Sequence, residues 1–444
     1  MRSKVTTLAS LLIVLAAFIA GTRFQKHRRL LDELWGARQT IDVRAMPRPV
    51  GLTVHELHSR STLDTALLPL LIDTVEMPDV LGVHHGGGGI TVVGDAIIIA
   101  DVKGAFFAVR AKGDTSNTLA LPALPNFEDQ YDQFARKPFP LGTTGPMVNT
   151  GFGLHDVESR MEPAGIRLFV SYERYLKELN TTALVVSTIL LGETDLRPRG
   201  SWQDIYRGQP LDAEWYSGAA GGGRMTTKGN YLYLSVGDYN QDNVFMASTL
   251  ESQNPDNDFG KILKIDLRTK AKRLVSMGHR NTQGLTITAN GTMYATEQGP
   301  RGGDRLNTIV AGGNYGWPVT TLGTHYTTYD WPHHSRQTAA PHFEQPLYAW
   351  VPSVGPSNLI EVTHFNIAWN NDLLVESLKA QSLFRLRRDS EGRVIYSEPI
   401  RLGHRLRDIG TLTDGTLVLW TDDAQLMFIN VDTATLASNW RKMN

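Results

Sequence analysis

The chain has 444 residues, with 44 Lys and Arg against 45 Asp and Glu and a formal net charge of -1 at pH 7. This balance gives a nucleic-acid partner no electrostatic support, and the absence of cysteine excludes disulfides, thiol catalysis and Cys-ligated metal sites. The 41 glycines and 21 prolines favour short strands joined by tight turns over long helices, and any metal must use oxygen or imidazole ligands.

The N-terminal segment is typical of an export signal. Arg2 and Lys4 precede an apolar run over residues 8–20, which is the charged and then apolar layout of such signals. Small residues fit a cleavage site poorly around Ala20, and basic residues follow at once. We favour an uncleaved signal anchor over residues 1–22, with a cleaved signal peptide as the alternative. Either places the rest of the chain outside the cytoplasm, in the periplasm, and the anchor would tether it to the membrane.

Residues 23–75 are predicted to be a connector or stalk. The segment is amphipathic and helix-prone at its start, becomes irregular, and carries Pro47 and Pro49. The propeller domain described next is expected to cover residues 76–444.

Beyond residue 86 the chain repeats short apolar or alternating runs separated by turn residues. The first group reads ITVV, AIIIAD and AFFAVR, and the same texture returns at least five more times before the C-terminus. Turn signals every 8 to 12 residues or so indicate an all-β array. We predict a six-bladed β-propeller of four-stranded antiparallel blades, with a pair of β-sandwich domains as the alternative.

The least generic stretch covers residues 274–326. It contains GHRNTQGL at residues 278–285 and EQGPRGGDR at residues 297–305, separated by two apolar runs and an Asn-Gly turn. This spacing predicts a β-hairpin with a functional loop at each end.

The ordered motifs of the central third resemble a known family. GGRMTTKGNYLYLSVGDYNQDN, NPDNDFGKILKIDL, GHRNTQGL, EQGPRGGDRLN and GGNYGWP closely resemble the soluble glucose and aldose-sugar dehydrogenases that use pyrroloquinoline quinone (PQQ). The resemblance continues more loosely through WVPSVGPSN, LKAQSLFRL and RLRDIG. It implies an exported six-bladed propeller that needs PQQ and calcium.

PQQ carries three carboxylates, so a site for it needs several cations on different elements, and planar guanidinium groups pair well with carboxylates. The resemblance places a set of residues of this chain at cofactor-contacting positions. They are Arg280, Gln298, Gly299, Ser353, Lys379, Arg405 and Arg407.

The same resemblance implies a calcium site at the glycine-rich loop. Main-chain oxygens of Gly299 and Pro300 would hold the ion, with Asp304 as the acidic residue of the site, because calcium takes carbonyl and carboxylate oxygens. The family has a second acid after this aspartate. Here that residue is Arg305, which places a second, structural calcium in doubt, although Tyr315 of the same neighbourhood is present.

Catalysis shows a larger departure. In the family a histidine removes the hydroxyl proton while hydride passes to the quinone, and the matching position here is Ala220. Asp238, which would orient that histidine, is present, as is Arg280, which would stabilise negative charge on the reduced quinone. The orienting acid therefore remains while the base is missing.

Two side chains are candidates to replace the base. Asp238 is one, although an aspartate with an ordinary pKa of about 3.9 is a poor base at neutral pH. His155 is the other; it lies in GFGLHDVE, where Gly151 takes the place of a cofactor-contacting glutamine. The alternative for His155 is a strand histidine that points into a blade.

The resulting hypothesis is a PQQ- and calcium-dependent dehydrogenase that oxidises an aldose sugar at its anomeric carbon to a lactone. Its catalytic residues would be Asp238, Arg280 and His155, and its partners a small sugar and an unidentified electron acceptor. Two alternatives stand beside it: a non-catalytic propeller that binds a saccharide, quinone or protein, and a calcium-dependent lactone hydrolase.

Overall fold

The computed structural model describes residues 59–77, 88–94, 96–110, 117–125, 127, 152–212, 218–242, 250–326, 329 and 342–443. All of them belong to one compact unit formed by residues 50–136 and 149–444. The signal anchor predicted for residues 1–22, most of the predicted connector and Gly151 lie outside the described residues. Within the described ranges, no helix has the length and apolarity needed to cross a bilayer.

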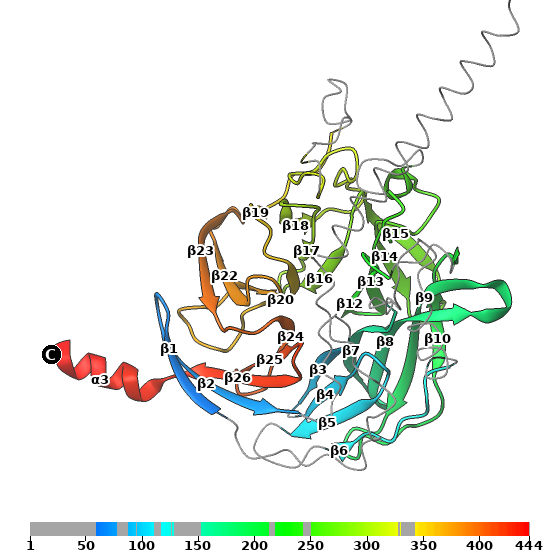
Figure 1. Cartoon of the computed structure of the whole chain (residues 1–444). Helices are drawn as coiled ribbons and strands as arrows, with labels where there is room; N and C mark the ends of the chain where they lie inside the picture. Colours follow the sequence, from blue (N-terminus) through cyan, green and yellow to red (C-terminus); the bar gives the residue numbers. More distant parts are fainter. Residues whose placement is uncertain are drawn as a thin grey trace, which may run out of the picture. The chain divides into compact units, whose positions relative to one another are not determined.

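The described residues form six antiparallel sheets (Figure 1). Five are built from strands consecutive in the chain. The first sheet contains β3 (Gly89–Val93), β4 (Ala96–Ala100), β5 (Phe106–Arg110) and β6 (Asn117–Thr118), and the second contains β7 (Leu154–Glu162), β8 (Gly165–Leu176), β9 (Thr181–Leu191) and β10 (Gln203–Arg207), with β11 (Leu211–Asp212) also paired to β9. The third contains β12 (Gly222–Lys228), β13 (Tyr231–Val236), β14 (Lys261–Asp266) and β15 (Lys272–Met277), and the fourth contains β16 (Thr282–Ile287), β17 (Met293–Glu297), β18 (Asp304–Ile309) and β19 (Tyr348–Trp350). The fifth contains β20 (Pro356–Glu361), β21 (Leu373–Ser377), β22 (Ser382–Arg388) and β23 (Val394–Arg401).

The sixth sheet joins the two ends of the propeller sequence. Its order is β1 (Ser59–Asp64), β2 (Pro69–Glu76), β26 (Gln425–Val431), β25 (Leu417–Thr421) and β24 (Leu406–Thr411). In Figure 1 the blue strands β1 and β2 lie beside the red strand β26. Helix α3 (Thr433–Met443) follows β26, and the short helices η2 (Lys177–Leu179) and η4 (Glu251–Gln253) lie in loops.

This sheet corrects the predicted domain boundary. The connector was expected to end at residue 75, but residues 59–76 already form two propeller strands. Leu70, Ile72 and Val75 of β2 are buried in this sheet, although residues 23–75 were predicted to be a connector. Their partner, β26, lies about 350 residues further along the chain, so local pattern did not reveal it.

The innermost strands of the six sheets form a closed ring. Contacts run in order through β3, β7, β12, β16, β20 and β24, and β24 contacts β3. Apolar side chains fill the space between neighbouring sheets; for example, Ile97 and Ile99 pack with Val418 and Leu426. The predicted all-β six-bladed propeller is therefore confirmed, with a fifth strand in the closing blade and in the blade of β7 to β10. The alternative of two sandwiches is wrong.

Each blade presents the start of its innermost strand and the end of its second strand at the same end of the ring, here called the strand-start face. The antiparallel register fixes this placement, through the pairs Leu154 with Tyr172, Gly222 with Val236, Thr282 with Glu297, Pro356 with Ser377, and Leu406 with Thr421. Neighbouring blades are bonded at these same ends. The bonds include Asp238 N to Arg280 O, Gln298 Nε2 to Pro356 O, and Ser357 Oγ to Leu406 O.

A buried ion pair joins all six innermost strands. The Arg224 guanidinium of β12 lies 3.1 Å from the Asp408 carboxylate of β24, and both side chains are almost fully buried. Their other partners come from the remaining blades: Asp156 of β7 (2.8 Å), Gln283 O of β16 (2.8 Å), Ile90 N of β3 (2.8 Å) and Asn358 of β20 (2.6 Å). Because a buried charge needs such partners, this pair fixes the blades to one another near the axis.

Candidate functional site

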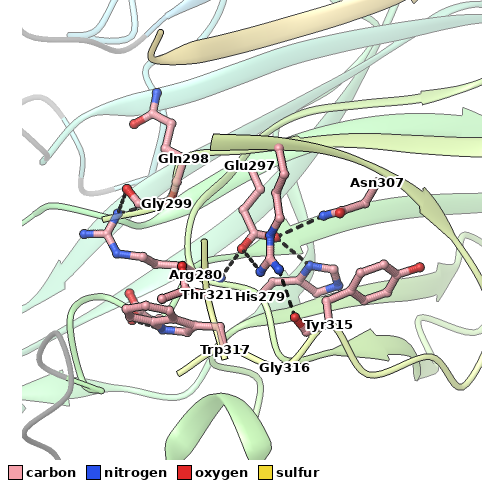
Figure 2. A network of polar contacts seen from close by, with 12 residues as sticks. His279, Arg280, Glu297, Gln298, Gly299, Asn307, Tyr315, Gly316, Trp317 and Thr321 are labelled. Carbon is pink, nitrogen blue, oxygen red and sulfur yellow. Dashed lines mark hydrogen bonds and ion pairs between the residues drawn. The ribbon is translucent and has the colours of Figure 1, made fainter. Parts of the chain in front are cut away.

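Arg280 lies on the strand-start face, two residues before β16. Its Nη1 donates to the carbonyl oxygens of Gln298 (3.2 Å) and Gly299 (3.1 Å), and its guanidinium lies 5.5 Å from the Trp317 ring centroid (Figure 2). Arg280 is only 7% exposed, and its Nε makes no hydrogen bond within the described part of the chain. A buried cationic donor without a partner is costly and points to an anionic or carbonyl ligand.

Asp238 lies beside Arg280, because its backbone N–H donates to the Arg280 carbonyl at 2.8 Å. The side chain is fully buried, with Oδ2 accepting from Trp317 Nε1 (2.7 Å) and Oδ1 from the Asn240 N–H (2.9 Å). Burial raises the pKa of Asp238 to about 7, although the positive charge of Arg280 opposes the rise. The ordinary pKa expected for this carboxyl from sequence is therefore wrong, because the folded environment makes its proton affinity suitable for chemistry near neutral pH.

Ala220 lies directly against the Asp238 turn. The Tyr239 N–H donates to the Ala220 carbonyl at 3.1 Å, and a Cβ at Gly237 would lie 1.8 Å from that same oxygen. The Ala220 backbone has a φ of 58°. Its methyl group cannot accept a proton, so the position carries no base.

His155, near the start of β7, forms part of a second polar group on the strand-start face. Its Nε2 lies 3.3 Å from Oε1 of Glu173, and the same oxygen accepts from the Tyr239 hydroxyl. Glu173 and Tyr239 were not among the site residues predicted from the sequence. The one signal for Tyr239 was its position directly after Asp238, and nothing in the sequence around Glu173 of β8 indicated its partner 18 residues away.

The Asp304 carboxylate closes the loop predicted to hold calcium. Asp304 is buried, and its two oxygens accept four hydrogen bonds: Gly299 N (3.0 Å) and Ser353 Oγ (3.1 Å) on Oδ1, and Val354 N (2.8 Å) and Gly355 N (2.7 Å) on Oδ2. These donors occupy the lone pairs that a metal would use. In the structure Asp304 thus holds two loops together, and its predicted role as a calcium ligand would require the ion to replace some of these donors.

The two predicted carbonyl ligands are different. Gly299 O accepts from Arg280, and Pro300 O lies 3.4 Å from Ser353 Oγ, so each keeps a second lone pair. Calcium takes six to eight oxygens. Within the described residues no group of three His, Asp or Glu side chains is placed to hold a metal. Calcium would therefore fit here only if a bound ligand and water supplied most of its oxygens.

The remaining predicted cations lie on the next two blades. Arg405 and Arg407, at the start of β24, share the Asp422 carboxylate at 2.8 and 2.7 Å. Lys379, just after β21, is exposed, and no described residue pairs with its ammonium group. One carboxylate for two guanidinium groups leaves a net positive charge. Together with Arg280, the cationic side chains of the strand-start face thus lie on three blades.

Gln298 and Ser353 are positioned by neighbouring blades. The Gln298 amide accepts from Asn281 (3.2 Å) and donates to Pro356 O (2.9 Å), which bridges β17 to β20. Ser353 is held by Asp304 as described above. The structure thus brings Arg280, Gln298, Gly299, Ser353 and Lys379 into one continuous set of contacts, because the Lys379 N–H donates to Val354 O.

Beneath this loop, Glu297 is the centre of a buried network (Figure 2). It accepts from His279 (2.9 Å), the Arg280 N–H (3.0 Å) and Arg305 Nη2 (2.7 Å), and Arg305 Nη1 donates to Tyr315 O (3.0 Å). Although burial opposes it, the Arg305 charge lowers the pKa of Glu297 to about 2. A guanidinium thus occupies the neighbourhood where the resemblance suggested a second calcium, and the residues present do not fit that ion.

The six-bladed ring and the cationic loops at one end of it define a propeller of the sugar-dehydrogenase class. The Glucose / Sorbosone dehydrogenase family model matches residues 142–429, which is more than half of the chain, so the chain belongs to that family.

Individual relatives agree with this assignment. The chain is 26% identical over 251 residues to the aldose sugar dehydrogenase YliI of Escherichia coli, covering 52% of this chain and 64% of that protein. It is 27% identical over 234 residues to quinoprotein glucose dehydrogenase B of Acinetobacter calcoaceticus, covering 37% and 48%. The chain thus matches about half to two thirds of the length of these relatives.

The fold also matches a solved structure. The soluble aldose sugar dehydrogenase of Escherichia coli in its apo-form superposes with a TM-score of 0.62 at 21% identity, covering 81% of this chain and 99% of the other.

Proposed function

We propose that this protein is a dehydrogenase that oxidises an aldose at its anomeric carbon to a lactone, using PQQ with calcium. The observation that carries the proposal is the Arg280–Asp238 pair. A buried guanidinium with an unpaired Nε lies beside a buried carboxyl whose pKa is about 7. Family membership and the quinoprotein among the relatives support the same reading.

The chemistry of the cationic residues fits PQQ. Its three carboxylates would be met by Lys379 and by the Arg405–Arg407 pair, which retains net positive charge after Asp422 is counted. Guanidinium groups suit carboxylates because they offer paired donors in one plane. Gln298 and Ser353 would contact the cofactor from the adjoining loops, and Gly299 and Pro300 would give carbonyl oxygens to calcium. When bound, PQQ supplies the two-electron acceptor for the reaction.

Side chains of the protein would accept the proton and stabilise the negative charge. Oxidation of an anomeric C–H and O–H to a lactone carbonyl removes one hydride equivalent and one proton, so the site must accept a proton and stabilise negative charge. Arg280 would provide the charge stabilisation in a water-poor setting, where a fixed cation is most effective. Asp238 and His155 are the two proton acceptors available on the strand-start face.

Reconstitution tests the proposal. The purified chain is incubated with PQQ and Ca²⁺ and assayed with a panel of aldoses and a redox dye. We expect sugar-dependent dye reduction, loss of the quinone absorbance on adding sugar, and lactone as the product. Cofactor binding without any sugar oxidation, or no cofactor binding, would contradict the dehydrogenase.

Ala220 favours one second candidate, a propeller that binds cofactor or saccharide without turnover. The variant Ala220→His separates the two, because the left-handed φ of 58° at this position is one that histidine tolerates better than most residues. If the wild type binds PQQ but is inactive, turnover in Ala220→His indicates an intact site that lacks its base. Binding without turnover in both proteins favours the binding propeller.

We also propose that the chain works in the periplasm, tethered by residues 1–22. The basis is the charged and apolar layout of that segment. In a bacterial host the full chain should fractionate with membranes and be accessible to external protease in spheroplasts. A form without residues 1–22 that stays in the membrane fraction would argue against the anchor.

A further inference from the structure

The ring of His155 lies at the strand-start face against the Gly223 backbone. A Cβ at Gly223 would come within 2.6 Å of the His155 Cβ, and Gly223 has a φ of +93°. Glycine is therefore required at this position both to adopt its backbone conformation and to leave room for the imidazole. Gly223 is three residues from Ala220, so the ring stands close to the position that lacks a base.

Glu173 holds this ring. The residue is fully buried; Oε1 faces His155 Nε2 at 3.3 Å and accepts from the Tyr239 hydroxyl, whereas Oε2 is buried with no hydrogen-bond partner among the described residues. Glu173 therefore fixes the orientation of the His155 ring, with Nε2 toward the carboxylate.

Tyr239 connects this group to the Arg280–Asp238 pair. It directly follows Asp238, and its N–H donates to the Ala220 carbonyl at 3.1 Å. Its ring also packs on Gly221, since a Cβ there would lie 3.2 Å from the ring. The contacts thus run from His155 through Glu173 and Tyr239 to both Asp238 and Ala220.

The two available bases differ in access. Asp238 is fully buried, and each of its oxygens already accepts one hydrogen bond, from Trp317 or from Asn240, so its remaining lone pairs are not accessible from solvent. The His155 side chain is 14% exposed, and its Nδ1 has no hydrogen-bond partner in the described part of the chain. An open nitrogen on an oriented ring is better suited to take a proton from a substrate.

We propose that His155, held by Glu173 and Tyr239, accepts the anomeric hydroxyl proton in place of the histidine that is absent at position 220. This inference rests on the proposed function. The sugar O–H bond breaks and an N–H bond forms at Nδ1 of His155, while the oxygen electron pair forms the lactone carbonyl. The C–H bond electrons would leave as hydride, for which PQQ, when bound, would supply the acceptor. The imidazolium then returns its proton to water.

The test removes the imidazole ring of His155 by mutation and then supplies free imidazole from solution. The variant His155→Ala, loaded with PQQ and Ca²⁺, should lose about 10²- to 10⁴-fold in kcat with KM changed by less than about threefold, since the base acts on the chemical step. Added imidazole should restore activity in proportion to its concentration. PQQ affinity, measured by absorbance titration, should be unchanged. His364→Asn is the control, because this exposed histidine lies beyond the other end of β20 and has a φ of 65° that asparagine tolerates.

Each outcome decides between defined readings. Wild-type protein without sugar oxidation overturns the proposed function and this inference together. Active wild type with full activity in His155→Ala overturns the inference alone and leaves Asp238 as the base. Loss of activity without imidazole rescue, in a variant with the wild-type circular dichroism spectrum and Tm, shows a merely structural role and also overturns it. If His155→Ala does not fold, His155→Gln with the same kcat and KM comparison replaces it.

Discussion

Arg280 and Asp238 illustrate how burial converts ordinary side chains into reactive ones. In the fold, one nitrogen of the guanidinium lacks a hydrogen-bond partner and the carboxyl is fully removed from water. A group with a pKa of about 7 is half protonated at neutral pH, so Asp238 can either hold or release a proton there. The reactivity of Arg280 and Asp238 thus comes from their burial beside Trp317, which removes both side chains from water.

The variant Arg280→Met tests the role of the guanidinium. We expect a loss of about 10²- to 10³-fold in kcat, because a fixed cation that stabilises developing negative charge is removed. PQQ affinity should also fall, which absorbance titration of the apoprotein measures directly. Arg393→Met, an exposed substitution in the outer hairpin of β22 and β23, serves as control. Unchanged kcat in Arg280→Met would show that the cation has no catalytic role.

At the scale of elements, the loops at the strand-start face are organised by acids that never contact solvent. Asp304 ties the loop after β17 to the loop before β20 through four donors, and Glu297 ties His279 and Arg305 beneath them. The hairpin predicted from residues 274–326 is confirmed as β16 and β17, but both flanking loops lie at the same end, on the strand-start face. The geometry of the site that these loops form depends on the carboxylates of Asp304 and Glu297.

The variant Asp304→Asn tests this arrangement. The asparagine NH2 group would face backbone donors, so we expect a loss of about 1–3 kcal/mol in the free energy of unfolding, measured in urea. PQQ affinity should weaken, because the Gly299 and Ser353 loops lose their common anchor. Asp389→Asn is the matched control, because Asp389 also accepts hydrogen bonds from backbone N–H groups, but in an exposed turn. The Tm of this control variant should be unchanged. Equal effects from both variants would refute a specific role for Asp304.

At the scale of the whole molecule, the Arg224–Asp408 pair connects blades that the chain visits far apart. Arg224 bonds to strands on three other blades, and Asp408 to two more. Such a network is strongly destabilising when only one partner is removed, because the remaining charge stays buried.

Removing the guanidinium should therefore weaken the entire ring. We expect Arg224→Ala to lose about 3–5 kcal/mol in the free energy of unfolding, with Asp156 and Asp408 left uncompensated. Chemical denaturation monitored by tryptophan fluorescence measures the change. The double variant Arg224→Met with Asp408→Leu should recover part of the loss, and no recovery would contradict the electrostatic explanation.

The stability of the unit should also fall as pH rises. Burial raises the pKa of Asp101 to about 6, of Asp156 and Asp238 to about 7, and of Glu158 to about 8. The folded state then binds more protons than the unfolded state, whose carboxyls have pKa values near 4. Stabilisation from these groups is complete below about pH 4 and is lost as pH rises to about 8. Urea denaturation at pH 5 and pH 8 measures this, and Glu158→Gln should reduce the difference.

The sequence by itself determined the fold class and most of the residues at the strand-start face. Alternating apolar runs and turn residues are local signals, and they predicted six sheets, although β1 and β2 of the closing sheet were missed. Ordered motifs pointed to Arg280, Gln298 and Gly299, and to the cations Lys379, Arg405 and Arg407. These features depend on residue type and spacing, which are fully visible in the chain.

Only the tertiary structure decided what those residues can do. It moved β1 and β2 into the closing blade, saturated Asp304 with donors, raised the pKa of Asp238, and placed Glu173 and Tyr239 beside His155. The physical reason is common to all four. Hydrogen-bond partners and desolvation come from residues distant in sequence, so a carboxylate that reads as a metal ligand or a weak base in the chain acquires its role only from its buried neighbours.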